Sequence, residues 1–335
     1  MFTTNDSLNE IFSWPGMKEW LHFLFIPEHL AFFEGLEDMP LRMAAWRGQT
    51  SWNSDLQGMG EQLVDAANLV LELQNGTRNA LQLHEWKEWT PAPEADLKDP
   101  QNTFLITPAR KNPGGKKPAL LIVPGGGYEF VSFQNEGVPI LNLAEKKGYV
   151  PFLLRYRIAP QTYPAAQLDL LDAIRYIRQH AEEWNIDPQK IAVCGFSAGG
   201  HLAASSTALA AELLPEGKPD ALVLGYPVIS LEKGVAHEGS ALALLGKDDA
   251  DLRQALSVEK RIAPDFPPVF AWACLDDGTV LPENTRKLEQ ALEKQGVRHE
   301  CHYYPSGGHG CGLAYEKSAW PWSLKAFRFL DDCFH

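Results

Sequence analysis

From residue 80 onward, short apolar runs alternate with longer stretches in which apolar side chains recur every three or four positions. Short apolar runs bounded by turn residues are typical of buried strands, and the longer spacing is typical of helices with one buried face. The strand candidates lie at 80–89, 103–106, 119–123, 148–156, 191–193, 221–226, 268–274 and 299–304, and the clearest helices at 168–184, 282–295 and 318–334. Strands separated by helices predict an α/β fold with a mostly parallel, doubly wound sheet.

The first part of the chain has a different pattern, with helical spacing and few strand candidates. Residues 55–73, for example, carry apolar side chains at intervals of three and four. We therefore expect an N-terminal helical extension at 1–79 and a sheet-containing domain at 80–335. A polar, helix-prone stretch at 230–263 interrupts the alternation, and we expect it to be a lid insertion.

The strand candidate at 191–193 runs into the sequence Cys-Gly-Phe-Ser-Ala-Gly-Gly-His and then into a helix of small residues. Gly195 and Gly199 let the chain turn sharply between strand and helix, which would raise the side chain of Ser197 above the sheet edge. A hydroxyl there can attack a carbonyl, and the amide of Ala198 can face the oxygen that becomes negative. The pattern favours a nucleophilic serine over an ordinary strand-to-helix turn.

A nucleophilic serine needs a base, and the base needs a carboxylate that orients it. His309 lies in a glycine-rich loop after the strand candidate at 299–304, which leaves its imidazole free to approach Ser197. Asp277 occupies a post-strand turn earlier in the chain and is the preferred acid, with Asp276 as the alternative. A turn or helix-capping carboxylate is the non-catalytic interpretation of Asp277.

Three consecutive glycines follow the strand candidate at 119–123, and the last two are Gly126 and Gly127. Backbone amides without side chains can approach a substrate oxygen, so we expect these two, with Ala198, to form an oxyanion hole. A plain flexible turn is the alternative. Tyr128 follows the glycines and is a candidate substrate-binding residue, and no phosphate-binding motif fits this loop.

Several motifs follow one another as in bacterial α/β-hydrolase esterases. The chain most resembles the acetyl-xylan and feruloyl carbohydrate esterases, which are related to the hormone-sensitive-lipase-like family. The motifs are Pro124-Gly125-Gly126-Gly127-Tyr128, Glu136-Gly137, Arg155-Tyr156-Arg157-Ile158-Ala159-Pro160, Asp187-Pro188, Gly195-Phe196-Ser197-Ala198-Gly199-Gly200-His201-Leu202, Asp277 and Gly308-His309-Gly310. The resemblance covers about residues 100–335 and implies the α/β-hydrolase fold, the triad and an esterase activity. Pro124 stands where the lipase-like branch has histidine, which favours the carbohydrate-esterase group.

Residues 1–99 lie outside this resemblance, and they hold most of the tryptophans. These are Trp14, Trp20, Trp46, Trp52, Trp86 and Trp89. An N-terminal segment in such enzymes often packs over the active-site mouth as a cap, where aromatic rings could stack on a sugar. The alternative is that tryptophans at helical spacing anchor a small subdomain.

Composition agrees with a soluble enzyme, since 335 residues of which 45% are hydrophobic can bury a large core. The net charge of −13 disfavours binding to nucleic acid or to an anionic membrane, and a solvated acidic face explains it most simply. The five cysteines are odd in number and lack disulfide or metal spacing. With no signal-peptide pattern at the N-terminus and no apolar stretch long enough to span a membrane, we expect a cytoplasmic protein.

Three further residues are expected to have structural roles. His201 falls one helical turn after the serine, so it should point into the core and form hydrogen bonds there. Asp169 should pair with Arg155 or Arg157, and Glu136 should cap the helix after the glycine loop.

The sequence therefore predicts a serine carboxylic-ester hydrolase that needs no metal and no organic cofactor. His299 and His302 are three apart in a strand candidate, so they should face opposite sides and cannot share an ion. The expected partner is a small-molecule ester, above all an acetylated carbohydrate. A broad short-chain carboxylesterase and a catalytically silent hydrolase-fold binding protein are the alternatives, and the sequence does not indicate the oligomeric state.

Overall fold

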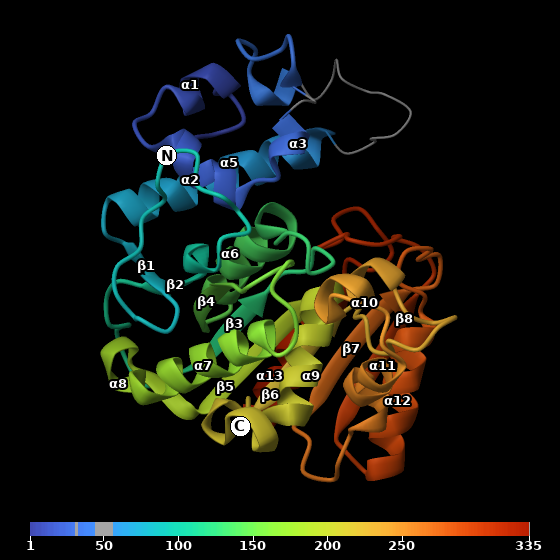
Figure 1. Cartoon of the computed structure of the whole chain (residues 1–335). Helices are drawn as coiled ribbons and strands as arrows, with labels where there is room; N and C mark the ends of the chain where they lie inside the picture. The colour runs from blue at the N-terminus through green and yellow to red at the C-terminus, as the bar shows by residue number, and fades with distance from the viewer. Residues whose placement is uncertain (31–32, 44–55, 335) are drawn as a thin grey trace.

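The computed structural model describes residues 1–30, 33–43 and 56–334, and these residues form one eight-stranded sheet flanked by helices (Figure 1). The strands are β1 (Arg78–Gln82), β2 (Phe104–Pro108), β3 (Lys117–Val123), β4 (Val150–Arg155), β5 (Ile186–Phe196), β6 (Ala221–Gly225), β7 (Val269–Cys274) and β8 (His299–Tyr304). Their order across the sheet is β1-β2-β4-β3-β5-β6-β7-β8. The pairs β1–β2 and β2–β4 are antiparallel, and the other five pairs are parallel. The predicted mostly parallel, doubly wound sheet is confirmed.

Burial explains why the inner strands could be recognised as continuous apolar runs. Every residue of β4, β6 and β7 is buried, because helices cover both faces of the sheet there. The edge strand β8 is half-buried along most of its length, and most of its side chains are accordingly polar or have a polar end.

The helices that follow the strands pack on the two faces of the sheet (Figure 1). They are α6 (Val138–Lys146), α7 (Ala165–Gln179), α8 (Ala181–Trp184), α9 (Ser197–Leu213), α10 (Glu238–Leu245), α11 (Ala250–Leu256), α12 (Glu283–Gln295) and α13 (Trp322–Phe334). The last of these begins four residues later than the predicted helix at 318–334. Left-handed backbone at Ala314 and Glu316 keeps the preceding segment in turns.

The chain reverses its direction of winding at β3, which lies between β4 on one side and β5 on the other. In open α/β sheets the loops at such a switch point leave in opposite directions and form a crevice at the carboxyl ends of the strands. The glycine loop follows β3, and Ser197 follows β5. The topology therefore brings the two predicted functional loops to the same edge of the sheet.

The described part of the N-terminal segment forms three short helices and one long helix, α5, at one end of the molecule, beside the antiparallel strands (Figure 1). They are α1 (Leu8–Phe12), α2 (Met17–Leu24), α3 (Pro27–Leu30) and α5 (Leu56–Gln74). Trp20 and Trp89 pack edge to face with ring centroids 5.4 Å apart, and Trp89 stacks on Phe104 of β2 at 4.3 Å. These contacts support the anchoring interpretation of the tryptophans. The predicted cap role and the boundary at residue 79 remain predictions.

The structure also bears on the cysteines and on the apolar helices. All five cysteines are free thiols. Within the described ranges, no helix combines the length and the apolar character that crossing a bilayer requires. Trp46 and Trp52 lie outside the described residues.

Candidate active site

Ser197 lies at the turn between β5 and α9, in a backbone conformation that non-glycine residues rarely adopt. Its φ is +51°, and this kind of local strain persists only where the surrounding packing enforces it. Gly199 provides that packing, because a Cβ on Gly199 would lie 2.2 Å from the carbonyl oxygen of Val123. The close approach of α9 to β3 therefore requires glycine, and it holds the serine at the carboxyl edge of the sheet.

His309 and Asp277 meet the serine at this edge, although they come from loops far away in the sequence. The Nε2 atom of His309 is 2.8 Å from Oγ of Ser197, and its Nδ1 atom is 2.7 Å from Oδ2 of Asp277. Because a carboxylate can only accept, Nδ1 carries the ring proton and Nε2 is left to accept from the serine hydroxyl. The other carboxylate oxygen, Oδ1, accepts the amides of Thr279 and Val280, both at 2.9 Å. The structure thus brings the three predicted residues into one chain of hydrogen bonds.

Asp276 has a different position from its neighbour Asp277. Its carboxylate accepts the amides of Gly308 at 2.9 Å and Gly307 at 3.0 Å, and these hydrogen bonds, led by that of Gly308, lower the pKa of Asp276. Asp276 therefore fastens the backbone of the loop that carries His309, whereas Asp277 contacts the imidazole.

The glycine loop lies directly against the serine. A Cβ on Gly125 would lie 2.8 Å from Cβ of Ser197, so the loop passes as close as backbone can. Gly126 and Gly127 both have positive φ, and Ala198 lies in the first turn of α9, where amides have no intrahelical acceptor. Ala198 follows the serine directly, and Gly126 and Gly127 follow the glycine that packs against it. The oxyanion role of the three amides remains a prediction.

Tyr128 and His201 form a buried pair beneath the loop. The Nε2 atom of His201 donates to the carbonyl of Leu256 at 3.0 Å, so Nδ1 accepts from the hydroxyl of Tyr128 at 2.8 Å. Burial lowers the pKa of His201 to about 4, which keeps the ring neutral, and the predicted structural role of His201 is confirmed. Tyr128 is 2% exposed, and its predicted role in substrate binding remains a prediction.

The prediction that Glu136 caps a helix is wrong. Glu136 lies in a π-helical turn, Phe133–Gly137, which rotates its side chain inward, and α6 begins after it without a side-chain cap. The buried carboxylate instead accepts the amide of Gly125 and the hydroxyl of Tyr226, both at 2.7 Å. Burial raises the pKa of Glu136, and the two hydrogen bonds act in the opposite direction.

The two residues before Glu136 in this turn reach other parts of the molecule. Gln134 accepts the amide of Ile26 at 2.7 Å and lies 2.8 Å from Nδ1 of His29, both in the N-terminal segment. Asn135 donates to the carbonyl of Gly310 beside His309, and its side-chain oxygen accepts from Gln62 of α5 at 3.3 Å. The turn therefore connects the N-terminal helices with the loops of the candidate site.

The stretch predicted as a lid contributes α10 and α11, and α10 approaches the glycine loop. The hydroxyl of Ser240 lies 3.8 Å from where a Cβ on Gly127 would be. His237 accepts the amide of Ser240 at 3.2 Å. Burial lowers the pKa of His237, and the nearby ring of His309 lowers it further. Sequence analysis did not identify His237, because no local motif marks it. The role of 230–263 as a lid remains a prediction.

Asp169 pairs with Arg157, as predicted, through contacts of 2.6 and 2.8 Å. Sequence analysis missed its second partner, His84, whose ring lies 2.8 Å from Asp169 and 3.0 Å from Asp172. This network lies on α7 and on the connection after β1, away from Ser197.

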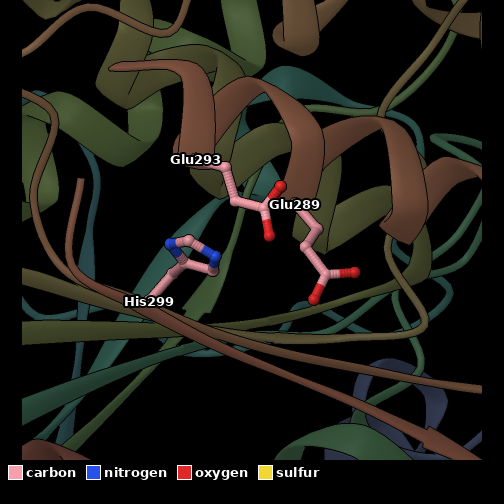
Figure 2. Close-up of side chains that lie close together, drawn as sticks. All are labelled: Glu289, Glu293 and His299. Atoms are coloured by element: carbon pink, nitrogen blue, oxygen red, sulfur yellow. The ribbon is translucent and has the colours of Figure 1, made fainter. Parts of the chain in front are cut away.

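One group of three side chains within the described ranges could hold a metal ion. Glu289 and Glu293 of α12 and His299 of β8 have potential ligand atoms within 4.8 Å of one another (Figure 2). His302 is not part of the group, and its Nε2 atom lies 3.3 Å from the carboxylate of Glu300. His299 begins β8, and the loop with His309 follows its other end, about 17 Å away at about 3.3 Å per residue. The group is therefore separate from the candidate active site.

Comparison with known proteins agrees with this geometry. The chain is 31% identical over 225 residues to an acetylxylan esterase of Xylanibacter ruminicola. The aligned region covers 65% of this chain and 45% of that protein. It is 38% identical over 128 residues to an ethyl acetate hydrolase of Pseudomonas putida, covering 37% and 39% of the two chains. The chain spans less than half the length of these curated relatives.

A solved structure extends the likeness to the fold. The acetyl ester-xyloside bifunctional hydrolase of Caldicellulosiruptor lactoaceticus superposes with a TM-score of 0.66 at 34% identity, over 76% of this chain and 95% of that one. The resemblance expected from the motifs is confirmed. A family model described as alpha/beta hydrolase fold matches residues 120–313, a range that includes the glycine loop, Ser197, Asp277 and His309. Because that match covers more than half of the chain, the protein belongs to the alpha/beta hydrolase fold family.

Proposed function

We propose that the protein is a serine carboxylic-ester hydrolase that acts on short acyl esters, above all acetyl esters of carbohydrates. One observation carries the proposal: Oγ of Ser197 lies 2.8 Å from Nε2 of His309, whose Nδ1 lies 2.7 Å from Asp277. This is the hydrogen-bond order that a base-activated serine requires, and distances of this size allow direct proton transfer.

The proposed reaction has two halves. His309 takes the proton of Ser197 while Oγ bonds to the ester carbonyl carbon, and the amides of Gly126, Gly127 and Ala198 stabilise the negative oxygen. The imidazolium then gives its proton to the departing alcohol, which leaves an acyl-serine. In the second half, His309 takes a proton from water as the water attacks the acyl carbon, and it returns that proton to Ser197 as the acid departs.

The carbohydrate assignment is supported by two kinds of observation. The named relatives include an acetylxylan esterase and an acetyl ester-xyloside hydrolase. The segment after His309 also carries an exposed aromatic pair, Tyr315 and Trp320, with ring centroids 4.6 Å apart. Exposed aromatic faces of this kind can pack against a sugar ring.

A broad short-chain carboxylesterase is the second candidate, because the chain is also similar to an ethyl acetate hydrolase. Acetylated xylo-oligosaccharides should be compared with simple acetate, butyrate and hexanoate esters. The carbohydrate proposal predicts a higher kcat/KM for the acetylated oligosaccharide than for any simple ester. The reverse order would favour the second candidate.

The serine mechanism is tested with two substitutions. Ser197→Ala removes the attacking hydroxyl and His309→Ala removes the base, so each should lower kcat on p-nitrophenyl acetate by a factor on the order of 10⁴–10⁶. The wild type should also be labelled covalently by a fluorophosphonate, and Ser197→Ala should not. Near-normal turnover by Ser197→Ala would reject the mechanism, and a wild type that neither labels nor turns over would indicate a silent binding protein.

A further inference from the structure

We propose that Glu136 and Tyr226 are positioning residues that hold the glycine loop and the His309 loop in one fixed arrangement. This inference rests on the proposed function, because it concerns how that site is assembled. Both side chains are buried, with exposed fractions of 3% for Glu136 and 1% for Tyr226. Neither takes part in the proton transfers among Ser197, His309 and Asp277.

A continuous series of hydrogen bonds connects the two loops through these residues. The amide of Gly125 donates to Oε2 of Glu136 at 2.7 Å, and the hydroxyl of Tyr226 donates to Oε1 at 2.7 Å. The amide of Gly312, three residues after His309, donates to the same hydroxyl oxygen at 2.9 Å. Trp322 donates to the carbonyl of Gly312 at 3.0 Å and fixes the far end.

The hydrogen bonds of this connection run from the amide of Gly312 through the hydroxyl of Tyr226 to Glu136. Because an amide can only donate, the hydroxyl oxygen of Tyr226 accepts from Gly312, and its proton is available for Glu136. Both oxygens of Glu136 therefore act as acceptors, which suits an ionised carboxylate. Three hydrogen bonds of 2.7 to 2.9 Å between buried groups leave the connection little freedom to move.

The connection spans the catalytic geometry itself. Gly125 is at one end and packs against Ser197, with only 2.8 Å between Cβ of the serine and the place a Cβ would take. At the other end the ring of Tyr226 packs against the imidazole of His309, with ring centroids 4.9 Å apart. The length of the connection therefore sets how far the oxyanion amides lie from the base. A misplacement of about 1 Å in such an arrangement can cost about 10²-fold in rate.

Tyr226→Phe and Glu136→Gln test the inference. The first keeps the ring against His309 and removes the bridging hydroxyl. The second replaces one carboxylate oxygen by an amide nitrogen, which cannot accept. Either the bond from Gly125 is lost, or the hydroxyl of Tyr226 must turn and accept from that nitrogen instead of donating. Each should lower kcat on p-nitrophenyl acetate by about 10- to 100-fold and leave KM within about threefold, because the loops act mainly on the transition state. If Glu136→Gln fails to fold, Tyr226→Phe decides.

Tyr149→Phe is the matched control. Tyr149 is also buried and also donates to a carboxylate, Asp331 of α13 at 2.9 Å. It lies just before the first residue of β4, at the opposite end of the parallel strands from Ser197. It should lose a comparable amount of thermal stability and keep the wild-type kcat. If Tyr149→Phe lost as much kcat as Tyr226→Phe, the loss would be explained by a general loss of stability, and the inference would be overturned.

A double-mutant cycle adds a second criterion. Since both residues belong to one connection, the combined variant should lose little more kcat than the worse single variant. Additive losses, or wild-type kcat in Tyr226→Phe, would overturn the inference while the esterase assignment stands. A wild type without any ester hydrolysis would overturn the proposed function and this inference together.

Discussion

Asp276 and Asp277 are adjacent in the chain, yet their carboxylates do different things. Asp277 contacts the imidazole of His309, and Asp276 contacts the backbone of the loop that carries it, through the amides of Gly307 and Gly308. One carboxylate thus orients the ring, and the other orients the loop.

Substitution by asparagine should separate these roles. Asp277→Asn places an amide group against Nδ1 and favours the wrong ring tautomer, so we expect kcat to fall by about 10⁴. Asp276→Asn keeps an oxygen that can accept the loop amides, so its kcat should stay within about tenfold of the wild type. Steady-state kinetics on p-nitrophenyl acetate compare the two, and the reverse order would make Asp276 the acid.

Local signals explain which site residues the sequence could identify. Ser197 and His309 lie in glycine-rich turns that follow strands, so their position at the carboxyl edge of the sheet follows from the local pattern alone. The direction of Glu136 depends on an extra residue in a π-helical turn, and that of Tyr226 on how a strand end meets another loop. Neither property is periodic, so helix capping was a reasonable but wrong expectation for Glu136.

At the scale of elements, the contact between α9 and β3 leaves no room for a side chain at Gly199. A Cβ there would lie 2.2 Å from the carbonyl oxygen of Val123 and 2.4 Å from that of Pro124. Both neighbours are backbone in the core of the molecule, so they cannot rotate away.

Gly199→Ala should therefore lower the free energy of unfolding by at least about 3 kcal/mol, or prevent folding. The matched control is Gly115→Ala, since a Cβ at Gly115 meets no atom within 4 Å and the backbone there is not left-handed. Urea unfolding and soluble yield measure the difference. Equal stability of the two variants would contradict the close approach seen here.

The segment between His309 and α13 carries the exposed rings of Tyr315 and Trp320, with exposed fractions of 57% and 44%. If this pair supports a sugar, Trp320→Ala should raise KM for an acetylated xylo-oligosaccharide by about 3- to 10-fold, in line with about 1 kcal/mol for an aromatic contact. KM for p-nitrophenyl acetate should not change. Trp14→Ala removes an equally exposed ring from the N-terminal segment and should alter neither value. Parallel changes for both substrates would count against a sugar contact.

Most elements could be predicted because the parallel strands are buried on both faces, which leaves a direct mark on the sequence. Their ends were less accurate. The opening strand, expected at 80–89, pairs only over Arg78–Gln82, because left-handed backbone at His84 and Trp86 turns the chain away. Packing imposes the left-handed backbone at these two positions, and a histidine or a tryptophan in the sequence does not predict it.

At the scale of the whole molecule, His84 fastens the connection after β1 to α7. Its hydrogen bonds with Asp169, and then with Asp172, raise the pKa of His84 to about 9 from its ordinary value of 6.5. The folded state therefore holds this proton more tightly than the unfolded chain does. The resulting stabilisation is complete below pH 6.5 and is lost as the pH rises through about 9.

His84→Gln checks this sign. The difference in free energy of unfolding between wild type and variant should be largest below pH 6.5 and should disappear above about pH 9, as measured by urea unfolding. His180→Gln serves as control, because that ring bonds the carbonyl oxygen of Tyr176 and no carboxylate. A gap for His84→Gln that grows with rising pH would contradict the proposed linkage.

Three consecutive side chains of the π-helical turn form hydrogen bonds with three different parts of the molecule. Gln134 accepts the amide of Ile26 in the N-terminal segment, Asn135 donates to the carbonyl of Gly310 next to His309, and Glu136 accepts the amide of Gly125 in the glycine loop. Changes among the first helices can thus reach the loops of Ser197 and His309 through one short turn and a few hydrogen bonds. Substitutions in the N-terminal segment can consequently alter turnover through these contacts, and trimmed versions of this chain should be assayed as altered catalysts.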